Sequence, residues 1–349
     1  MTILDVTGNS NSSLAAGSGN LPPVAQRWPT LRVASTGETQ VNRAYSGDMA
    51  QDQAFKAYTI SRSADTNAMV LCDINDARFV NLSRISRYKD ILSRIVGDIV
   101  LPTRKTVRSI DVTKTGSWAN TQVDAYGMYA NSVGAKVSAV VPGTTVYVGI
   151  LVDNEPASAG VTADVYIDGV NKGTISSDNI GVNKGNGNTY NGLRYGPALI
   201  RFPGLVAGNH TVEVRVTSSG KNMYVSYFAG NGNQPATAKV KVGNMYKLNA
   251  TGIAAFGVTE AISIAFRDAA EAVVFAFDAD GFNVETLDTF SAIDPATCLM
   301  PDGLHWNATG HAAVKAEMEG PVTEHWPTEW GNTLNVTFLG GVVQSYHET

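Results

Sequence analysis

Cysteine, charge and long apolar runs are all scarce in this 349-residue chain. It has 2 cysteines, Cys72 and Cys298, too few for a disulfide framework or a zinc site, so we expect both to be small buried hydrophobic residues. Charged residues make up 16% of the sequence and the formal net charge is −5, without the basic stripe that a nucleic-acid-binding protein shows. No apolar run reaches about 18 residues, so we expect no membrane insertion.

The rest of the composition is that of a folded protein. Hydrophobic residues make up 44% of the chain, and its 349 residues predict two domains at about 100–200 residues each. Glycine is abundant, with 34 residues. Many uncharged polar groups and few charges favour an extracellular protein or a virion tail protein. The N-terminal segment lacks a basic stretch and a long apolar core, so we expect no signal peptide.

The segment 104–235 differs from the rest of the chain and predicts an all-β insertion. Its candidate strands are rich in β-branched and aromatic residues: Val137–Val141, Thr145–Val152, Ala163–Ile167, Ala198–Phe202, Thr211–Val216 and Met223–Phe228. Turns containing glycine separate most of them, and a long Gly/Asn-rich loop spans Ser176–Tyr195. Many short strands with Gly-rich turns predict a β-sandwich of the jelly-roll kind.

Residues 1–103 and 236–349 carry a different pattern, in which strands alternate with helices. The candidate strands are Thr2–Thr7, Gln40–Tyr45, Asn67–Cys72, Lys239–Met245 and Phe282–Thr286. Apolar residues at helical spacing predict the helices Asp76–Val100, Thr259–Phe277 and Leu304–Met318. The alternation predicts a mostly parallel sheet with helices on both faces, so we expect an α/β domain interrupted by the β-insertion.

Polar residues follow several of these strands at the point where each strand ends. In chain order they are Gly8-Asn9-Ser10, Ser46-Gly47-Asp48, Asn75-Asp76 and, near the C-terminus, the turn Asp302-Gly303-Leu304-His305. Ligands bind at the carboxyl edge of a parallel sheet, so we expect these groups to converge there. A hydroxyl, backbone N–H groups, an amide and a carboxylate–imidazole pair are the components of an acyl-transfer site.

Four sequence blocks resemble, in order, those of the SGNH or GDSL-type hydrolases, a family of esterases and lipases. The blocks are Gly8-Asn9-Ser10-Asn11, the segment Asn-Arg-Ala-Tyr-Ser-Gly-Asp from Asn42 to Asp48, Asp73-Ile74-Asn75-Asp76, and the segment from Asp302 to His311. The last block, Asp-Gly-Leu-His-x-Asn-x-x-Gly-His, is the most specific because its residue types fall at fixed spacing. The resemblance covers residues 1–103 and 236–320 and implies a flavodoxin-like three-layer α/β/α fold.

The resemblance also implies a role for each matching residue. Ser10 would be the nucleophile, His305 the base and then the acid, and Asp302 the carboxylate that orients the histidine. The backbone N–H groups of Ser10 and Gly47 and the side-chain amide of Asn75 would form the oxyanion hole. The implied reaction needs neither a cofactor nor a metal.

Two residues depart from the family pattern. Asn9 stands where the family usually has Asp, and it keeps a polar side chain of nearly the same shape. Asp73 stands where the family usually has Gly, and a charged carboxylate there would oppose a developing oxyanion. Three other serines compete for the role of nucleophile, although none follows a strand and a glycine as Ser10 does. They are Ser12, Ser13 and Ser46.

Aromatic side chains supply candidate contacts with sugars. Trp306, directly after His305, could line the substrate pocket or pack against the sheet. In the insertion, the candidates for stacking on pyranose rings are Trp118, Tyr126, Tyr129, Tyr190 and Tyr195, and the alternative is that they are ordinary sandwich residues. In architecture the insertion resembles the jelly-roll carbohydrate-binding modules of polysaccharide-active enzymes.

These features predict a carbohydrate O-acetylesterase whose partner is an O-acetylated polysaccharide. Low charge, Gly/Asn-rich β-structure and the strand-like tail Asn332–Gln344 resemble bacteriophage tail-spike esterases that deacetylate capsule or O-antigen, and the tail could mediate a homotrimer. A bacterial esterase is the alternative source. Two other functions stay open. One is a glycan-binding adhesion module on a degenerate hydrolase scaffold, suggested by Asn9 and Asp73, and the other is a lipase-like enzyme for long acyl chains.

Overall fold

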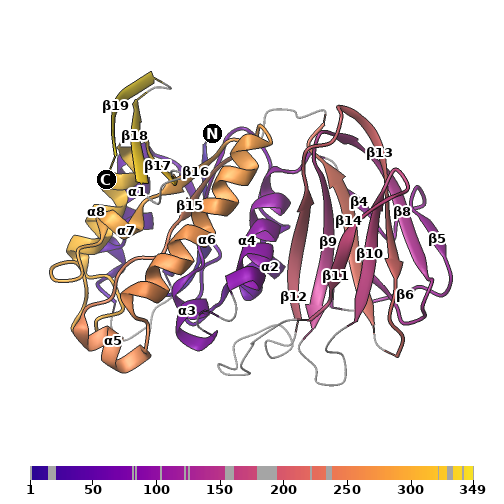
Figure 1. Ribbon diagram of the computed structural model, residues 1–349. Helices are drawn as coiled ribbons and strands as arrows, with labels where there is room; N and C mark the ends of the chain where they lie inside the picture. The colour runs from indigo at the N-terminus through magenta and orange to yellow at the C-terminus, as the bar shows by residue number, and fades with distance from the viewer. Residues whose placement is uncertain are drawn as a thin grey trace.

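The computed structural model describes residues 2–14, 21–80, 82, 85–102, 104–121, 123–124, 126–153, 161–178, 195–220, 222–232 and 238–320, and the backbone of 322–327, 333–339 and 342–348. Figure 1 shows two parts side by side, one with helices around a sheet and one built of strands. The chain runs from the first part into the second and then returns.

The first part is built on a sheet of five parallel strands. In chain order they are β1 (Ile3–Gly8), β2 (Thr39–Asn42), β3 (Thr66–Leu71), β15 (Lys239–Gly243) and β16 (Val284–Leu287). Across the sheet the order is β16-β15-β3-β1-β2, so the first strand after the insertion pairs with the last strand before it. The interior strands β1 and β3 are buried at nearly every position, because both faces of the sheet are covered.

Helices cover both faces of this sheet, as the sequence predicts. On one side α1 (Trp28–Thr36) packs with α8 (Ala308–Glu319), next to the short α7 (Thr289–Ala292). On the other side lie α2 (Ala50–Ala57), α4 (Ile85–Val100) and α6 (Glu260–Ala279). The short helices α3 (Ile74–Val80) and α5 (Ala250–Phe256) lie at the lower edge in Figure 1, where the parallel strands end.

Two predicted helices differ from the structure in their bounds. The single helix expected over Asp76–Val100 is wrong, because the chain forms α3 and then the separate α4. The helix expected from Leu304 begins at Ala308, because the Asn307 side chain accepts a hydrogen bond from the N–H of Gly310 and caps the helix there. The residues before this cap are left free to form the turn that carries Asp302 and His305.

The second part is a sandwich of two antiparallel sheets. Its strands are β4 (Arg104–Thr106), β5 (Thr113–Thr115), β6 (Ala119–Asn120), β7 (Met128–Ala130), β8 (Lys136–Gly143), β9 (Val146–Asp153), β10 (Thr162–Ile167), β11 (Val170–Ser176), β12 (Tyr195–Phe202), β13 (Gly208–Val216) and β14 (Met223–Gly230). One sheet has the order β11-β10-β13-β8-β5, and the other has β12-β9-β14-β7-β6 with β4 also paired to β14. The strands that the sequence does not predict, β4 to β7 and β11, are short or mostly exposed.

The two parts share one continuous apolar core. Every residue of β9 and β14 is buried, because one face of their sheet packs inside the sandwich and the other faces the helices. Tyr147 of β9 stacks on Phe277 of α6 with ring centroids 5.7 Å apart. A Cβ at Gly97 of α4 would lie 2.4 Å from the Leu199 side chain of β12, so this glycine permits the close approach of strand and helix.

The C-terminal segment forms an antiparallel sheet of β17 (Val322–Pro327), β18 (Thr333–Leu339) and β19 (Val342–Glu348). The strand-like character of the tail is therefore confirmed, and the homotrimer stays a prediction. None of the described helices combines the length and the apolar character that crossing a bilayer demands.

Candidate active site

The candidate nucleophile Ser10 lies in a tight turn directly after β1. A Cβ at Gly8 would lie 2.7 Å from the carbonyl oxygen of Leu71 in β3, so the strand can end this way only with glycine. The Asn9 side-chain oxygen accepts a hydrogen bond from the N–H of Asn11 at 3.0 Å, and the Ser13 N–H donates to the carbonyl of Ser10 at 3.2 Å. Asn9 thus forms the turn that an Asp could form, and this departure leaves the local geometry intact.

One side chain ties the Ser10 turn to the C-terminal block. The Asn11 amide accepts a hydrogen bond from the N–H of Trp306 at 3.0 Å and donates one to the Tyr246 hydroxyl at 2.8 Å. The Tyr246 hydroxyl in turn donates to the carbonyl of Leu304 at 2.6 Å. Because Asn11 follows Ser10 while Leu304 and Trp306 flank His305, these bonds bring two segments 295 positions apart to the same place.

Sequence reasoning missed both residues of this link. Tyr246 comes shortly after β15, at the carboxyl edge where the other site residues lie, so inspecting that strand end would have identified it. Asn11 belongs to a recognised block, but nothing local indicates a partner so far along the chain.

Asp302 and His305 form the expected pair. The Nδ1 atom of His305 lies 2.6 Å from an Asp302 carboxylate oxygen, and the other oxygen accepts the N–H groups of Leu304 and His305, both at 3.0 Å. Burial opposes ionisation of Asp302, but the hydrogen bonds from the imidazole and the two N–H groups outweigh it and lower the pKa of the carboxyl. A carboxylate that stays charged fixes the proton on Nδ1 and leaves Nε2 as the base.

Hydrogen bonds also join the second and third blocks to the Ser10 turn. The N–H of Tyr45 donates to the carbonyl of Gly8 at 3.1 Å, and the Asn42 amide donates to the carbonyl of Ser12 at 2.8 Å. The Asn75 amide donates to the carbonyl of Asp48 at 2.8 Å. The blocks that are dispersed in the sequence thus meet at one edge of the parallel sheet.

Hydrogen-bond donors without a protein partner remain at this edge. The backbone N–H groups of Ser10 and Gly47 donate to no other residue among those described. Gly47 has a φ of 88°, a conformation that favours glycine. The Asn75 amide has two protons, and the bond to Asp48 uses one of them. These three groups are the donors that the family resemblance implies for an oxyanion hole.

The segments that carry the candidate nucleophile and the candidate base are joined through Asn11, but the two side chains are not hydrogen-bonded to each other. Within the described residues, no hydrogen bond joins the Ser10 hydroxyl to the His305 ring. Ser10 is 5% exposed and the His305 side chain is 17% exposed, so the imidazole is the more accessible of the two. Catalytic hydrogen bonds are commonly long before substrate binds. The competitors Ser12 and Ser13 are fully buried and therefore inaccessible.

Asp73 is buried, two positions before the candidate oxyanion donor Asn75. One carboxylate oxygen accepts the N–H of Ile74 at 2.5 Å, and the other has no partner among the described residues. Burial above all, with the nearby Asp76 adding to it, raises the pKa of Asp73 to about 7. Burial and then the Asp73 charge raise the pKa of Tyr246, so Asp73 is within electrostatic range of the Ser10 link. The carboxyl is consequently not a fixed negative charge at neutral pH.

Two other buried acids accept backbone hydrogen bonds. The carboxylate of Asp76 accepts the N–H of Ala50 at 2.7 Å, and that of Asp52 accepts the N–H of Met49 at 2.9 Å. In the part of the chain that is described, no three His, Cys, Asp or Glu side chains are grouped to hold a metal ion.

The predicted aromatic contacts have different outcomes. Of the two alternatives for Trp306, the structure favours packing over contact with substrate, because the side chain is 1% exposed and its ring contacts Tyr246 and His311. Trp118 and Tyr195 are partly exposed on the sandwich, where Tyr195 meets Tyr224 edge-on, and a role for them in sugar binding stays a prediction. Tyr190 lies outside the described residues. Both cysteines are free and buried, as expected.

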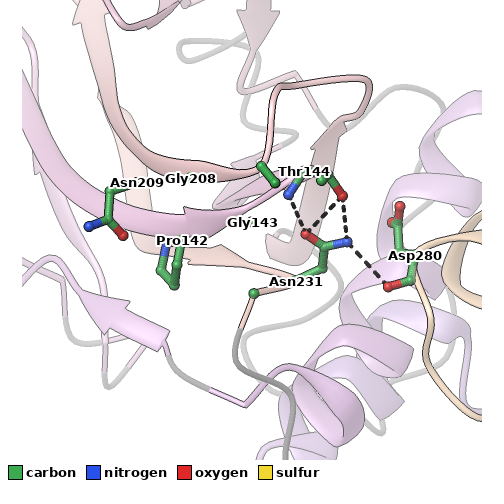
Figure 2. A pocket seen from close by; sticks show the side chains of 9 residues that line it. Pro142, Gly143, Thr144, Gly208, Asn209, Asn231 and Asp280 are labelled. Atoms are coloured by element: carbon green, nitrogen blue, oxygen red, sulfur yellow. Dashed lines mark hydrogen bonds between the residues drawn. The ribbon is translucent and has the colours of Figure 1, made fainter.

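A surface pocket of about 420 Å³ lies far from this edge (Figure 2). Its lining comes mostly from turns of the sandwich, with Asp280 after the end of α6. Figure 2 shows the Asn231 side chain bridging Thr144 and the Asp280 backbone. Asp280 follows the C-terminal end of α6, whereas α5, at the edge where the parallel strands end, precedes its N-terminal end. Helix α6 has 20 residues and so spans about 30 Å. The pocket is therefore separate from the candidate catalytic groups.

Comparison with known proteins gives structural neighbours only. No family model and no curated protein matches this chain. A two-domain esterase active on acetylated mannans is similar at 12% identity and a TM-score of 0.38, over 66% of this chain and 90% of that one. A family two carbohydrate esterase from Cellvibrio japonicus is similar at 14% identity and a TM-score of 0.28, over 53% of this chain and 52% of that one.

Carbohydrate-binding modules are also among the structural neighbours. A carbohydrate-binding module of the CBM36 type, solved with calcium and xylotriose, is similar at 14% identity and a TM-score of 0.26, over 36% of this chain and 97% of the module. At these identities and TM-scores, neither the activity nor the ligand of a neighbour transfers to this chain.

Proposed function

We propose that this protein is a serine esterase that removes O-acetyl groups from a polysaccharide. The observation that carries the proposal is the Asn11 link, which holds the Ser10 turn against the segment in which Asp302 and His305 are paired at 2.6 Å. The parallel sheet supports it. When only its five strands are numbered in chain order, they are arranged 2-1-3-4-5, the order of flavodoxin-like folds, whose ligands bind at the carboxyl edge.

In the first half of the reaction, Ser10 attacks the acetyl carbonyl carbon. His305 Nε2 accepts the hydroxyl proton, and Asp302 stabilises the imidazolium that forms. The negative oxygen of the tetrahedral intermediate accepts hydrogen bonds from the N–H groups of Ser10 and Gly47 and from the Asn75 amide. The ester bond then breaks, and the sugar hydroxyl leaves with the proton from His305.

In the second half, water hydrolyses the acetyl-serine. His305 takes a proton from the water, and the same donors stabilise the second oxyanion. Collapse of this intermediate releases acetate and returns the proton to Ser10. The partly exposed His305 and Asp302 side chains, at 17% and 18%, give water access to the base.

The test is acetate release from O-acetylated polysaccharides. The wild-type protein should release acetate, and Ser10→Ala should reduce the rate by about 10³-fold or more, because the covalent step is lost. Ser46→Ala, which removes a partly buried competing hydroxyl, is the matched control and should keep most of the activity. Equal rates for wild-type and Ser10→Ala would remove this mechanism.

The second candidate function is glycan binding without hydrolysis. The buried Asp73 carboxyl favours it, because an ionised Asp73 opposes an oxyanion. This alternative predicts retention of O-acetylated glycan with no acetate release. A preference for long acyl groups in a series of esters would instead indicate the lipase-like activity.

The proposal extends to the class of polymer and to the source of the protein. Capsule or O-antigen is the substrate class that a phage tail-spike protein would meet, and the C-terminal strands β17 to β19 would then assemble three chains. Light scattering distinguishes a trimer of this 36.9 kDa chain from a monomer.

A further inference from the structure

Tyr45 stands at the rim of the candidate active site. Its N–H donates to the carbonyl of Gly8 at 3.1 Å, and its carbonyl accepts the N–H of Asp48 at 3.3 Å. It is therefore fixed to the turn that carries Ser10 and precedes the oxyanion donor Gly47 by two positions. No feature of the family resemblance gives this residue a role.

The Tyr45 side chain is the most exposed of its segment, whose other residues are buried or partly buried. It is 47% exposed, whereas Ala44 before it is 8% exposed and the candidate nucleophile Ser10 is 5% exposed. Its hydroxyl makes no hydrogen bond to any residue that the structure describes. A large aromatic ring that is half exposed, in a segment whose backbone is hydrogen-bonded to the strand end just before Ser10, has an exposed surface and a free hydroxyl for a ligand.

The charge next to this ring is already neutralised. The Lys56 ammonium lies over the Tyr45 ring, 5.9 Å from its centroid, and makes an ion pair with Asp48. It also donates to the carbonyl of Arg43 at 3.3 Å. Lys56 can cover only one face of the ring, so the opposite face stays available. An uncharged ligand with an apolar face and hydroxyl groups suits these surroundings, and a pyranose has both.

We infer that Tyr45 is a specificity-determining residue that stacks on the sugar ring carrying the acetyl ester. This inference rests on the proposed esterase function. The small acetyl group reaches the buried Ser10, and the sugar, as the leaving group, stays at the surface beside Tyr45. The aromatic face packs against the C–H face of the pyranose, and the tyrosine hydroxyl bonds to a sugar hydroxyl.

The test compares two esters of acetic acid. One is the best substrate from a panel of acetylated mannan, acetylated xylan and an O-acetylated capsular polysaccharide, and the other is ethyl acetate, which has no ring to stack. The readout is the ratio of kcat/KM on the polysaccharide to kcat/KM on ethyl acetate. Tyr45→Ala should lower this ratio about tenfold, and Tyr45→Phe and Tyr45→Trp should restore most of it because they keep a ring.

Tyr58 provides the matched control. It is 44% exposed at the end of α2, and its ring meets Tyr126 of the sandwich edge-on at 5.8 Å, away from the Ser10 turn. Tyr58→Ala should leave the ratio within about twofold of wild-type. An unchanged ratio in Tyr45→Ala, or an equal loss in Tyr58→Ala, would overturn the inference while leaving the esterase intact.

Failure of the esterase proposal gives a different result. In that case Ser10→Ala and wild-type would release acetate equally from both esters. If wild-type hydrolyses ethyl acetate but none of the polysaccharides, the stacking of Tyr45 on a sugar ring is contradicted, whereas the esterase mechanism is not.

Discussion

At the scale of single residues, Asp73 is the group whose charge matters most to the proposed chemistry. It is buried two positions before the proposed oxyanion donor Asn75 and its pKa is raised to about 7, so it loses its proton within the range in which enzymes are assayed. Asp73→Asn keeps the shape and removes the charge. We expect kcat of Asp73→Asn relative to wild-type to rise roughly threefold to tenfold between pH 6 and pH 8, because only the wild-type gains a charge opposing the oxyanion. A ratio independent of pH would contradict this.

The same substitution has a predicted effect on stability. The usual pKa of the carboxyl is 3.8, and the folded protein raises it to about 7. Between these values the unfolded chain releases the proton first, so wild-type stability relative to Asp73→Asn falls as pH rises from 4 to 7 and stays low above that. The total difference is up to about 4 kcal/mol. Urea unfolding of both proteins at several pH values measures it.

Residues whose role depends on neighbours in sequence could be predicted, and those with distant partners could not. Asp302 and His305 are three positions apart, so their pairing follows from one turn. Trp306 is adjacent to His305, but its N–H is bound to Asn11 and its ring is buried, which local pattern does not show. The burial that sets the pKa of Asp73 likewise depends on the whole fold.

At the scale of elements, the close contact of β1 and β3 positions the Ser10 turn. A Cβ at Gly8 would meet the backbone oxygen of Leu71 at 2.7 Å, and a backbone atom cannot move away easily. Gly8→Ala should lower the free energy of unfolding by about 1–3 kcal/mol and lower the esterase activity, because the turn shifts. The matched control is Gly208→Ala, where a Cβ meets nothing within 4 Å. Thermal unfolding distinguishes the two, and equal effects would argue against this role of Gly8.

The periodicity of apolar residues predicts which segments are helices, whereas the residue at which a helix begins depends on a side-chain cap. The helix predicted over Thr259–Phe277 is α6, and the Thr259 side chain accepts the N–H of Ile262 as its cap. The helical spacing of apolar residues that begins at Leu304 continues into α8, but the helix itself begins only at Ala308, after the Asn307 cap. Strand β11 has exposed residues at nearly every position, so it has no apolar pattern to detect.

At the scale of the whole molecule, Asp280 joins the two parts. It follows α6 and is bound to three sandwich side chains: to Arg201 at 2.6 and 2.7 Å, to Thr145 at 2.7 Å and to the Tyr147 hydroxyl. Composition indicated the β-insertion, but these contacts between distant segments have no signature in the sequence.

Because the core is continuous across this junction, we expect both parts to unfold in one transition. Asp280→Ala should lower the free energy of unfolding by about 3 kcal/mol, since it leaves the partly buried Arg201 guanidinium and the buried Tyr147 hydroxyl without their partner. Calorimetry should show a single peak at a lower temperature. Two peaks in the wild-type protein would show that the sandwich and the α/β part unfold independently.

The central claim is that Ser10 is the nucleophile activated by His305. Its most direct measurement is mass spectrometry of the protein after reaction with a fluorophosphonate, which modifies activated serines covalently. We expect one adduct, on the peptide containing Ser10, and its loss in His305→Ala. An adduct on Ser46 instead, or labelling of Ser10 that is unaffected by His305→Ala, would show that Ser10 is not the activated nucleophile.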